Sequence, residues 1–149
     1  MKQKCLTLIL LLTVLAIPVS CSDDDNLEPV ALTDFNEVKN SIKSGERLVV
    51  VTDLAKCGFP QNLTGRMVMN DVIINNDEYL TFSLSHLTAN NPAYPGKAII
   101  ENLHYRLFND GTFEVTIKYI DPDTSEVIYE YEGDIICQIN EGVKIFSNL

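Results

Sequence analysis

Cys57, Cys137, His86 and His104 are the residues of this chain whose types best suit nucleophilic or acid–base chemistry. If the imidazole of His86 lay beside Cys57, it could take the thiol proton and create the nucleophile that a hydrolase requires. Cys57 and Cys137 can instead form a disulfide, which would contribute up to about 4.5 kcal/mol because it closes a long loop. Two buried free thiols are also consistent with the sequence.

The two histidines are predicted to lie on opposite faces of the structure. His86 shares one face of an alternating strand with Leu84, whereas His104 alternates against Leu103 and Tyr105. A zinc site needs three or four convergent ligands, and neither histidine has such a set nearby in the sequence. We therefore expect no metal and no cofactor. His86 is most simply a hydrogen-bonded residue at a strand end, with a role in a functional site as the alternative.

Familiar catalytic signatures are missing from the sequence, including G-x-S-x-G, H-E-x-x-H, C-x-x-C and the phosphate-binding loops. Residues 121–132, DPDTSEVIYEYE, carry acidic or hydroxyl side chains at four positions of a calcium-binding loop. Glu126, however, occupies the position at which that loop requires glycine. A proline-containing turn is the better interpretation.

The N-terminus has the composition of an export signal. Lys2 and Lys4 precede an almost wholly apolar run from residue 6 to residue 19, which small residues then follow. The run is shorter than the roughly 20 apolar residues that span a membrane comfortably. We therefore predict that residues 1–20 are a cleaved signal peptide, with an uncleaved anchor as the alternative.

The end of this segment, Cys21 followed by Ser22-Asp23-Asp24-Asp25, resembles a bacterial lipoprotein signal of the Bacteroidetes type, although Pro18 stands where leucine is usual. The resemblance implies that Cys21 carries lipid, including acyl chains such as palmitate. It also implies that this lipid anchors the protein to the outer membrane, with exposure on the cell surface. Residues 21–31 would then form an acidic, flexible tether.

The net charge excludes one class of partner. The chain has 11 basic and 21 acidic residues, and loss of residues 1–20 removes two lysines and no acid. Nucleic-acid binding depends on basic side chains that neutralise phosphates, so we expect no nucleic-acid partner. An unknown protein or a small ligand remains.

The elements that must position these residues are one helix followed by strands. Residues 33–45, TDFNEVKNSIKSG, predict an amphipathic helix that Thr33 or Asp34 can cap and Gly45 can end. Its apolar face is formed by Phe35, Val38 and Ile42. Asn109-Asp110-Gly111 between two alternating runs predicts a tight hairpin. The predicted strands cover residues 47–53, 67–74, 79–86, 99–108, 112–120, 127–139 and 143–146.

We therefore predict an α+β domain over residues 32–149, in which a short N-terminal helix joins a curled, mostly antiparallel meander of about seven strands. Curling hides the sheet edges, so a half-barrel or a small closed barrel is expected. A flat sheet under one helix is the alternative.

Three segments of the chain resemble the VirK family of small exported bacterial proteins. These are VVVTDLAKC (residues 49–57), LTFSLSHLT (80–88) and YRLFNDG (105–111), within a likeness that covers residues 32–120. The resemblance implies one compact exported domain. It supplies no catalytic residues, because the family has no assigned activity.

Together these features favour a non-catalytic binding or accessory module in the cell envelope. His86, Tyr105 and Arg106 are the candidate binding residues, since inward-facing tyrosines can line a ligand cavity as well as fill a core. The alternative is an exported hydrolase that uses Cys57 or His86.

Overall fold

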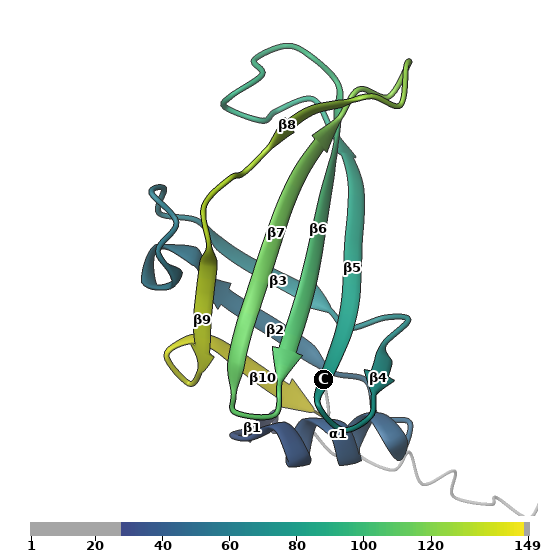
Figure 1. The fold of residues 1–149 in the computed structure, drawn as a ribbon, viewed down its shortest axis with the longest axis vertical. Coiled ribbons are helices and arrows are strands. Elements are labelled where there is room, and N and C mark those ends of the chain that lie inside the picture. The colour runs from purple at the N-terminus through teal and green to yellow at the C-terminus, as the bar shows by residue number, and fades with distance from the viewer. Residues whose placement is uncertain (1–27, 148–149) are drawn as a thin grey trace, which may run out of the picture.

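The computed structural model describes residues 28–147, which form a mostly β structure with one helix (Figure 1). The helix is α1 (Phe35–Lys43), and a short 3-10 helix, η1 (Leu54–Cys57), follows the second strand. The strands are β1 (Val30–Leu32), β2 (Val49–Asp53), β3 (Thr64–Val68), β4 (Ile73–Asn75), β5 (Tyr79–Thr88), β6 (Ile99–Phe108), β7 (Thr112–Ile120), β8 (Val127–Glu130), β9 (Ile135–Ile139) and β10 (Gly142–Ser147).

The strands form one curled sheet with the order β3-β2-β10-β9-β7-β6-β5-β4. β1 adds to β10, and β8 adds to β7. All pairings are antiparallel except a two-residue parallel match between β9 and β10, where the chain turns a corner. β3 and β4 lie at opposite ends of this order although only residues 69–72 separate them in the chain. The sheet must therefore curl until its two ends approach, which confirms the half-barrel.

The long hairpin of β6 and β7 owes its turn to the predicted Asp110-Gly111 pair. Gly111 has a φ of +87°, a conformation that glycine adopts without strain. The backbone N–H of Thr112 donates a 2.9 Å hydrogen bond to Asp110 Oδ1. This hydrogen bond lowers the pKa of the Asp110 carboxyl, because it favours the charged form. The turn chemistry thus sets the register of β6 and β7.

Helix α1 covers one end of the curled sheet (Figure 1). Asp34 caps it by accepting hydrogen bonds from the backbone N–H groups of Asn36 and Glu37. Phe35 and Val38 are buried, and Gly45, with a φ of +84°, follows the helix end as predicted. The helix therefore closes the lower opening of the half-barrel.

The core fills the inside of the curl. Phe82, Tyr105 and Phe113 form an aromatic cluster with ring centroids 4.8 to 6.2 Å apart. Val50 and Ile145, from strands on the other side of the curl, are fully buried in the same cluster of side chains. The inward positions predicted for β7 are confirmed, since Phe113, Val115 and Ile117 are all buried and Tyr119 packs against them.

The prediction of about seven strands was wrong, because ten are present. β1 contains Val30 and Ala31, which we had assigned to the tether, and it pairs with β10. The predicted strand 67–74 is two strands, interrupted where Asp71 adopts a positive φ of +51°. The predicted strand 127–139 is also two, because the chain bends at residues 131–134 around Gly133. Alternation in sequence persists across such bends, whereas hydrogen-bonded pairing does not.

The predicted signal peptide, Cys21 and most of the acidic tether lie outside the residues that the structure describes. No helix within residues 28–147 combines the length and apolar character needed to cross a membrane.

Candidate binding cleft

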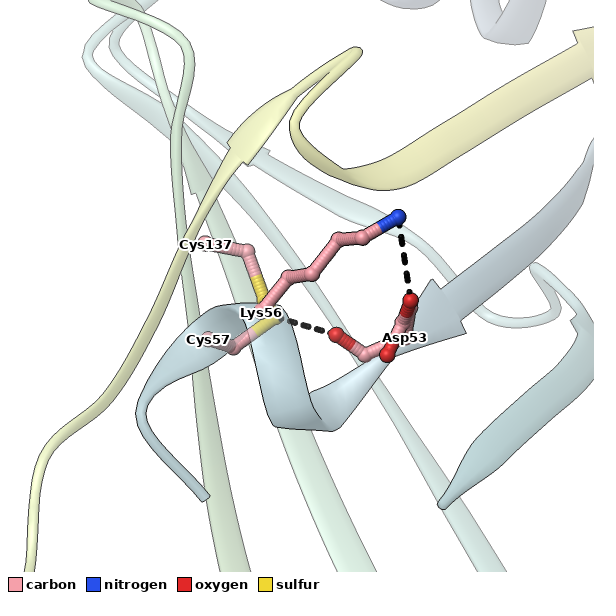
Figure 2. The surroundings of a disulfide bond; sticks show 4 residues. All are labelled: Asp53, Lys56, Cys57 and Cys137. Atoms are coloured by element: carbon pink, nitrogen blue, oxygen red, sulfur yellow. Dashed lines mark hydrogen bonds and ion pairs between the residues drawn. A yellow bond between two sulfur atoms is a disulfide. The ribbon is translucent and has the colours of Figure 1, made fainter. Parts of the chain in front are cut away.

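The disulfide between Cys57 and Cys137 is formed, and it joins η1 to β9 (Figure 2). The Cα atoms of the two cysteines are 4.5 Å apart, and each residue is 2% exposed. The Sγ of Cys57 also lies 3.1 Å from the carbonyl oxygen of Asp53, a contact without a hydrogen bond because the oxidised sulfur carries no proton. Beside it, Lys56 Nζ lies 3.2 Å from Asp53 Oδ2. In this state Cys57 has no thiolate to offer as a nucleophile.

A cleft opens where the curled sheet fails to close, between β3 on one side and the inner face of β5 and β6 on the other. We call it the β3–β5 cleft, and its volume is about 310 Å³. Ligand sites in proteins typically begin at about 300 Å³, so the cleft suits a small molecule. Its walls are mostly apolar, and charged side chains also line it. The residues that define it are Thr52, Leu54, Leu63, Thr64, Gly65, Arg66, Met67, Leu84, His86, Glu101, Leu103 and Tyr105.

The cleft exists because β5 is longer than the strands that lie opposite it, so that the inner face at one end of β5 is not covered by a second layer. Along its inner face, Leu80 and Phe82 are buried, Leu84 is half-buried, and His86 has 45% of its side chain exposed. The predicted inward direction of His86 is confirmed by its place in the cleft. The same face of one strand therefore changes from core to accessible surface within six residues.

His86 is held at the rim of the cleft by Glu101. His86 Nε2 lies 3.0 Å from Glu101 Oε2, while Glu101 Oε1 accepts a 2.6 Å hydrogen bond from the amide of Asn91. Asn91 is 7% exposed and also accepts from the backbone N–H of Ala93. One carboxylate thus connects the histidine to the loop between β5 and β6.

Three tyrosines from the loop, β7 and β8 lie in contact beside this group. The ring of Tyr119 makes an edge contact with Tyr94 at 5.8 Å and stacks on Tyr129 at 5.0 Å between centroids. Burial raises the pKa of the Tyr119 phenol, and a hydrogen bond with Asn91 opposes that effect. Tyr129 is exposed, so this aromatic group continues the rim of the open end toward β8.

Tyr105 forms the floor of the cleft and is part of the core. It is 2% exposed, and burial raises the pKa of its phenol well above the ordinary value.

Arg106 and His104 lie on the outer face of the sheet, away from the cleft. The guanidinium of Arg106 stacks over Tyr79, 5.0 Å from the ring centroid, and lies 3.6 Å from a carboxylate oxygen of Glu114. His104 lies within hydrogen-bond distance of Thr81 Oγ1 (3.1 Å) and Ser83 Oγ (2.9 Å). Of the three candidate binding residues, the structure brings together His86 and Tyr105 but not Arg106.

A second, larger hollow of about 560 Å³ lies on the outer side of β2 and β10, near the disulfide. Asp53, Lys56, Glu141 and Lys144 line it, so its charges of opposite sign offset one another. Asp53 Oδ1 is buried there without a hydrogen-bond partner. The mixed acidic and basic side chains of this second hollow do not favour any one class of ligand. We therefore take the β3–β5 cleft as the candidate site.

Sequence reasoning missed Glu101 and Asn91. Glu101 alternates in phase with the inward residues Leu103 and Tyr105. An acidic residue at an inward position of a strand could have identified it as a candidate site residue. Asn91 lies in a loop where no periodicity applies.

Within residues 28–147, no group of three His, Cys, Asp or Glu side chains is arranged to hold a metal ion.

Comparison with known proteins places the chain in a family with a defined fold. The family described as VirK protein matches residues 31–125, well over half of the chain, and the protein belongs to this family. A solved structure that it resembles is that of lpg1832, a VirK family protein from Legionella pneumophila. The TM-score is 0.72 at 23% identity, over 78% of this chain and 98% of that one. Comparison with curated proteins gives no significant match.

Proposed function

We propose that this protein is a lipid-anchored binding module of the bacterial cell envelope, which takes a small ligand with an apolar body and a polar end into the β3–β5 cleft. The observation that carries the proposal is the cleft itself: a hollow of about 310 Å³ with leucine walls and a rim that bears His86 and Glu101. Small-molecule sites commonly combine apolar walls with a few polar groups that fix orientation.

The disulfide supports a non-catalytic role. It engages Cys57, the strongest nucleophile candidate, and leaves His86 paired with Glu101. A hydrolase would then have to rely on His86 as a base. The wild-type protein can be tested for hydrolysis of a simple ester. Activity that is lost in Glu101→Gln or His86→Gln would favour the hydrolase over ligand binding alone.

The binding test uses 1-anilinonaphthalene-8-sulfonate, whose aromatic body and sulfonate match the proposed class. The chain from residue 21 onward, with Cys21→Ser so that no lipid is attached, should bind it with enhanced fluorescence. Leu84→Trp should abolish the signal because the indole fills the cleft. Ser85→Trp makes the same substitution one residue further along, on the opposite face of β5, and should leave binding unchanged. Equal binding by both variants would refute a ligand site in this cleft.

The envelope location rests on the sequence of the N-terminus and needs its own test. Cells that express the full chain and are fed labelled palmitate should yield a labelled, membrane-associated product. Cys21→Ser should remove the label, because no other residue receives the lipid in the proposed scheme. An unlabelled wild-type protein that keeps residues 1–20 would contradict the anchoring.

A further inference from the structure

The segment from β8 to β9 has an unusual surface for the rim of a sheet. Eight large apolar side chains are exposed among the described residues, and half of them fall between residues 127 and 136. These four are between 39% and 53% exposed: Val127, Ile128, Tyr129 and Ile136. All four residues of β8 are exposed, although it is a regular strand. Exposed apolar side chains gathered in one place indicate an interaction surface more often than scattered ones do.

β8 also presents a backbone edge that can accept another strand. Within the described part of the chain it pairs with β7 alone, along the upper end of that strand (Figure 1). The backbone N–H of Tyr131 donates to the carbonyl of Ile117 on β7. Because backbone groups of a strand alternate in direction, those of Glu130 face away from β7. A bulge between Tyr119 and Ile120 interrupts this alternation at Ile128. Beyond the bulge the backbone N–H of Asp121 donates to the carbonyl of Glu126, so the backbone groups of Val127 also face away. These groups are the pairing positions for an added strand.

The charge around this edge is predominantly negative. Residues 119–143 contain seven acids and no lysine, arginine or histidine; the acids are Asp121, Asp123, Glu126, Glu130, Glu132, Asp134 and Glu141. Two basic side chains from outside this stretch lie near these acids. Lys118 Nζ lies 3.0 Å from Glu130 Oε1. Backbone hydrogen bonds from Thr124 and Asp123 lower the pKa of the Asp121 carboxyl, and the charge of Lys97 adds to that effect. The family match ends at residue 125, so this edge lies beyond the matched region.

We propose that the free edge of β8 is a docking site for an extended, basic segment of a partner protein, which adds to the sheet as a further strand. Backbone hydrogen bonds from Val127 and Glu130 would hold the segment, and the exposed apolar side chains would pack against its apolar residues. Lysines or arginines of the segment would face the acids on either side. This site is separate from the β3–β5 cleft and does not depend on ligand binding there.

A second copy of this chain fits the edge poorly. Self-pairing of two β8 strands would bring Glu126, Glu130, Glu132 and Asp134 of each copy close to the same residues of the other. Like charges opposite each other across strands are destabilising. Negative charge on an edge therefore discourages self-association and still permits a basic partner.

The test uses two fluorescent octapeptides with blocked ends, one of alternating lysine and valine and one of alternating glutamate and valine. Anisotropy is measured with the full chain in neutral detergent micelles, and micelles alone give the baseline. We expect the basic peptide to bind and the acidic peptide not to bind. Equal binding of the two, or none by either, would overturn the proposal.

Proline at residue 127 separates strand addition from charge attraction. Val127→Pro removes an N–H that faces away from β7, at the first residue of β8, a position at which an edge strand tolerates proline. This variant should lower the affinity for the basic peptide at least tenfold. In the wild-type chain, the peptide should also protect the amides of Val127 and Glu130 from hydrogen exchange, a measurement that does not depend on how the variant folds. Unprotected amides would overturn strand addition.

The charge component has a matched control elsewhere on the molecule. Glu132→Lys with Asp134→Lys should lower the affinity for the basic peptide at least tenfold and should allow the acidic peptide to bind. Glu46→Lys with Glu78→Lys makes the same change in net charge at exposed positions near α1 and β4 and should leave both affinities unchanged. Equal losses in the two double variants, or a dimer that dissociates when Val127→Pro is introduced, would overturn the proposed partner.

Discussion

Strands β5, β6 and β7 each run through two regions of the molecule, a covered lower region and an open upper region (Figure 1). In the lower region Leu80, Leu107 and Phe113 are fully buried under β2, β10 and α1. In the upper region the same inward faces carry His86, Glu101 and Tyr119, which are accessible to different degrees. Cover by a second layer, and not the strand pattern, decides which inward positions form core and which can form a site.

The two regions also differ in what holds them together. The lower region combines apolar burial with the Cys57–Cys137 disulfide, whereas the upper region depends on polar contacts such as Asn91 with Glu101. Apolar burial and a cross-link each contribute several kcal/mol, whereas a single hydrogen bond such as that of Asn91 with Glu101 contributes roughly 1–3 kcal/mol. The lower region should therefore supply most of the folding stability, and the upper region should supply the ligand-binding surface.

The largest expected effect comes from truncation of an aromatic residue in the covered region. Phe113→Ala should lower the free energy of unfolding by about 3–5 kcal/mol, because it leaves a cavity in the core. Tyr129→Ala in the open region should cost less than about 1 kcal/mol. Denaturant unfolding of both variants measures the contrast, and similar losses would refute the division.

Removal of the disulfide should have the next largest effect. Cys57→Ser with Cys137→Ser should lower the free energy of unfolding by about 2–4 kcal/mol, since the unfolded chain gains conformational freedom. A reducing agent should destabilise the wild-type protein by a similar amount and leave the double variant unaffected. Hydrogen exchange of the loop at residues 89–98 should remain unchanged, because that loop is held by other contacts.

Alkaline pH should weaken the covered region through Tyr105. Burial raises the pKa of this phenol in the folded protein, so the folded state binds the proton more tightly than the unfolded state does. Stability is then retained below the unfolded pKa of about 10 and falls above it, by at most about 1.4 kcal/mol per pH unit. Tyr105→Phe should make this decline shallower in unfolding experiments between pH 9 and 11, and an identical decline would contradict the assignment.

The smallest effect concerns the open region. Glu101→Gln removes the charge that faces His86 and should change the global free energy of unfolding by less than about 1 kcal/mol. Amides in residues 89–98 should nevertheless exchange faster, because the hydrogen bond from Asn91 loses a charged acceptor. A large global loss with no local change would show that the two regions are not separate.

Several features of the fold could be predicted from the sequence because they depend on neighbours in the chain. The helix with its Asp34 cap, the Asp110-Gly111 turn and the inward face of β7 all follow from local conformational preference or from alternation. The division of two predicted strands was missed, since alternation continues through a bend while pairing stops. The addition of β1 to β10 was missed because it joins the two ends of the described chain.

The candidate site was predictable only in part. The inward direction of His86 followed from the period of two, but Arg106 was grouped with it although adjacent residues of a strand point to opposite faces. The sequence left the disulfide and two free thiols as alternatives, and the approach of η1 to β9 decided between them.

The sequence by itself determined the sheet-rich class, the turn chemistry, the acidity of residues 119–143 and the faces on which each side chain would lie, because these depend on residues within a few positions of one another. Only the tertiary structure decided that Cys57 meets Cys137, that β3 stands away from β5, and that the edge of β8 is left open. Those outcomes depend on how far the whole sheet curls, and curvature is the sum of twists and bends over many strands that no short segment encodes.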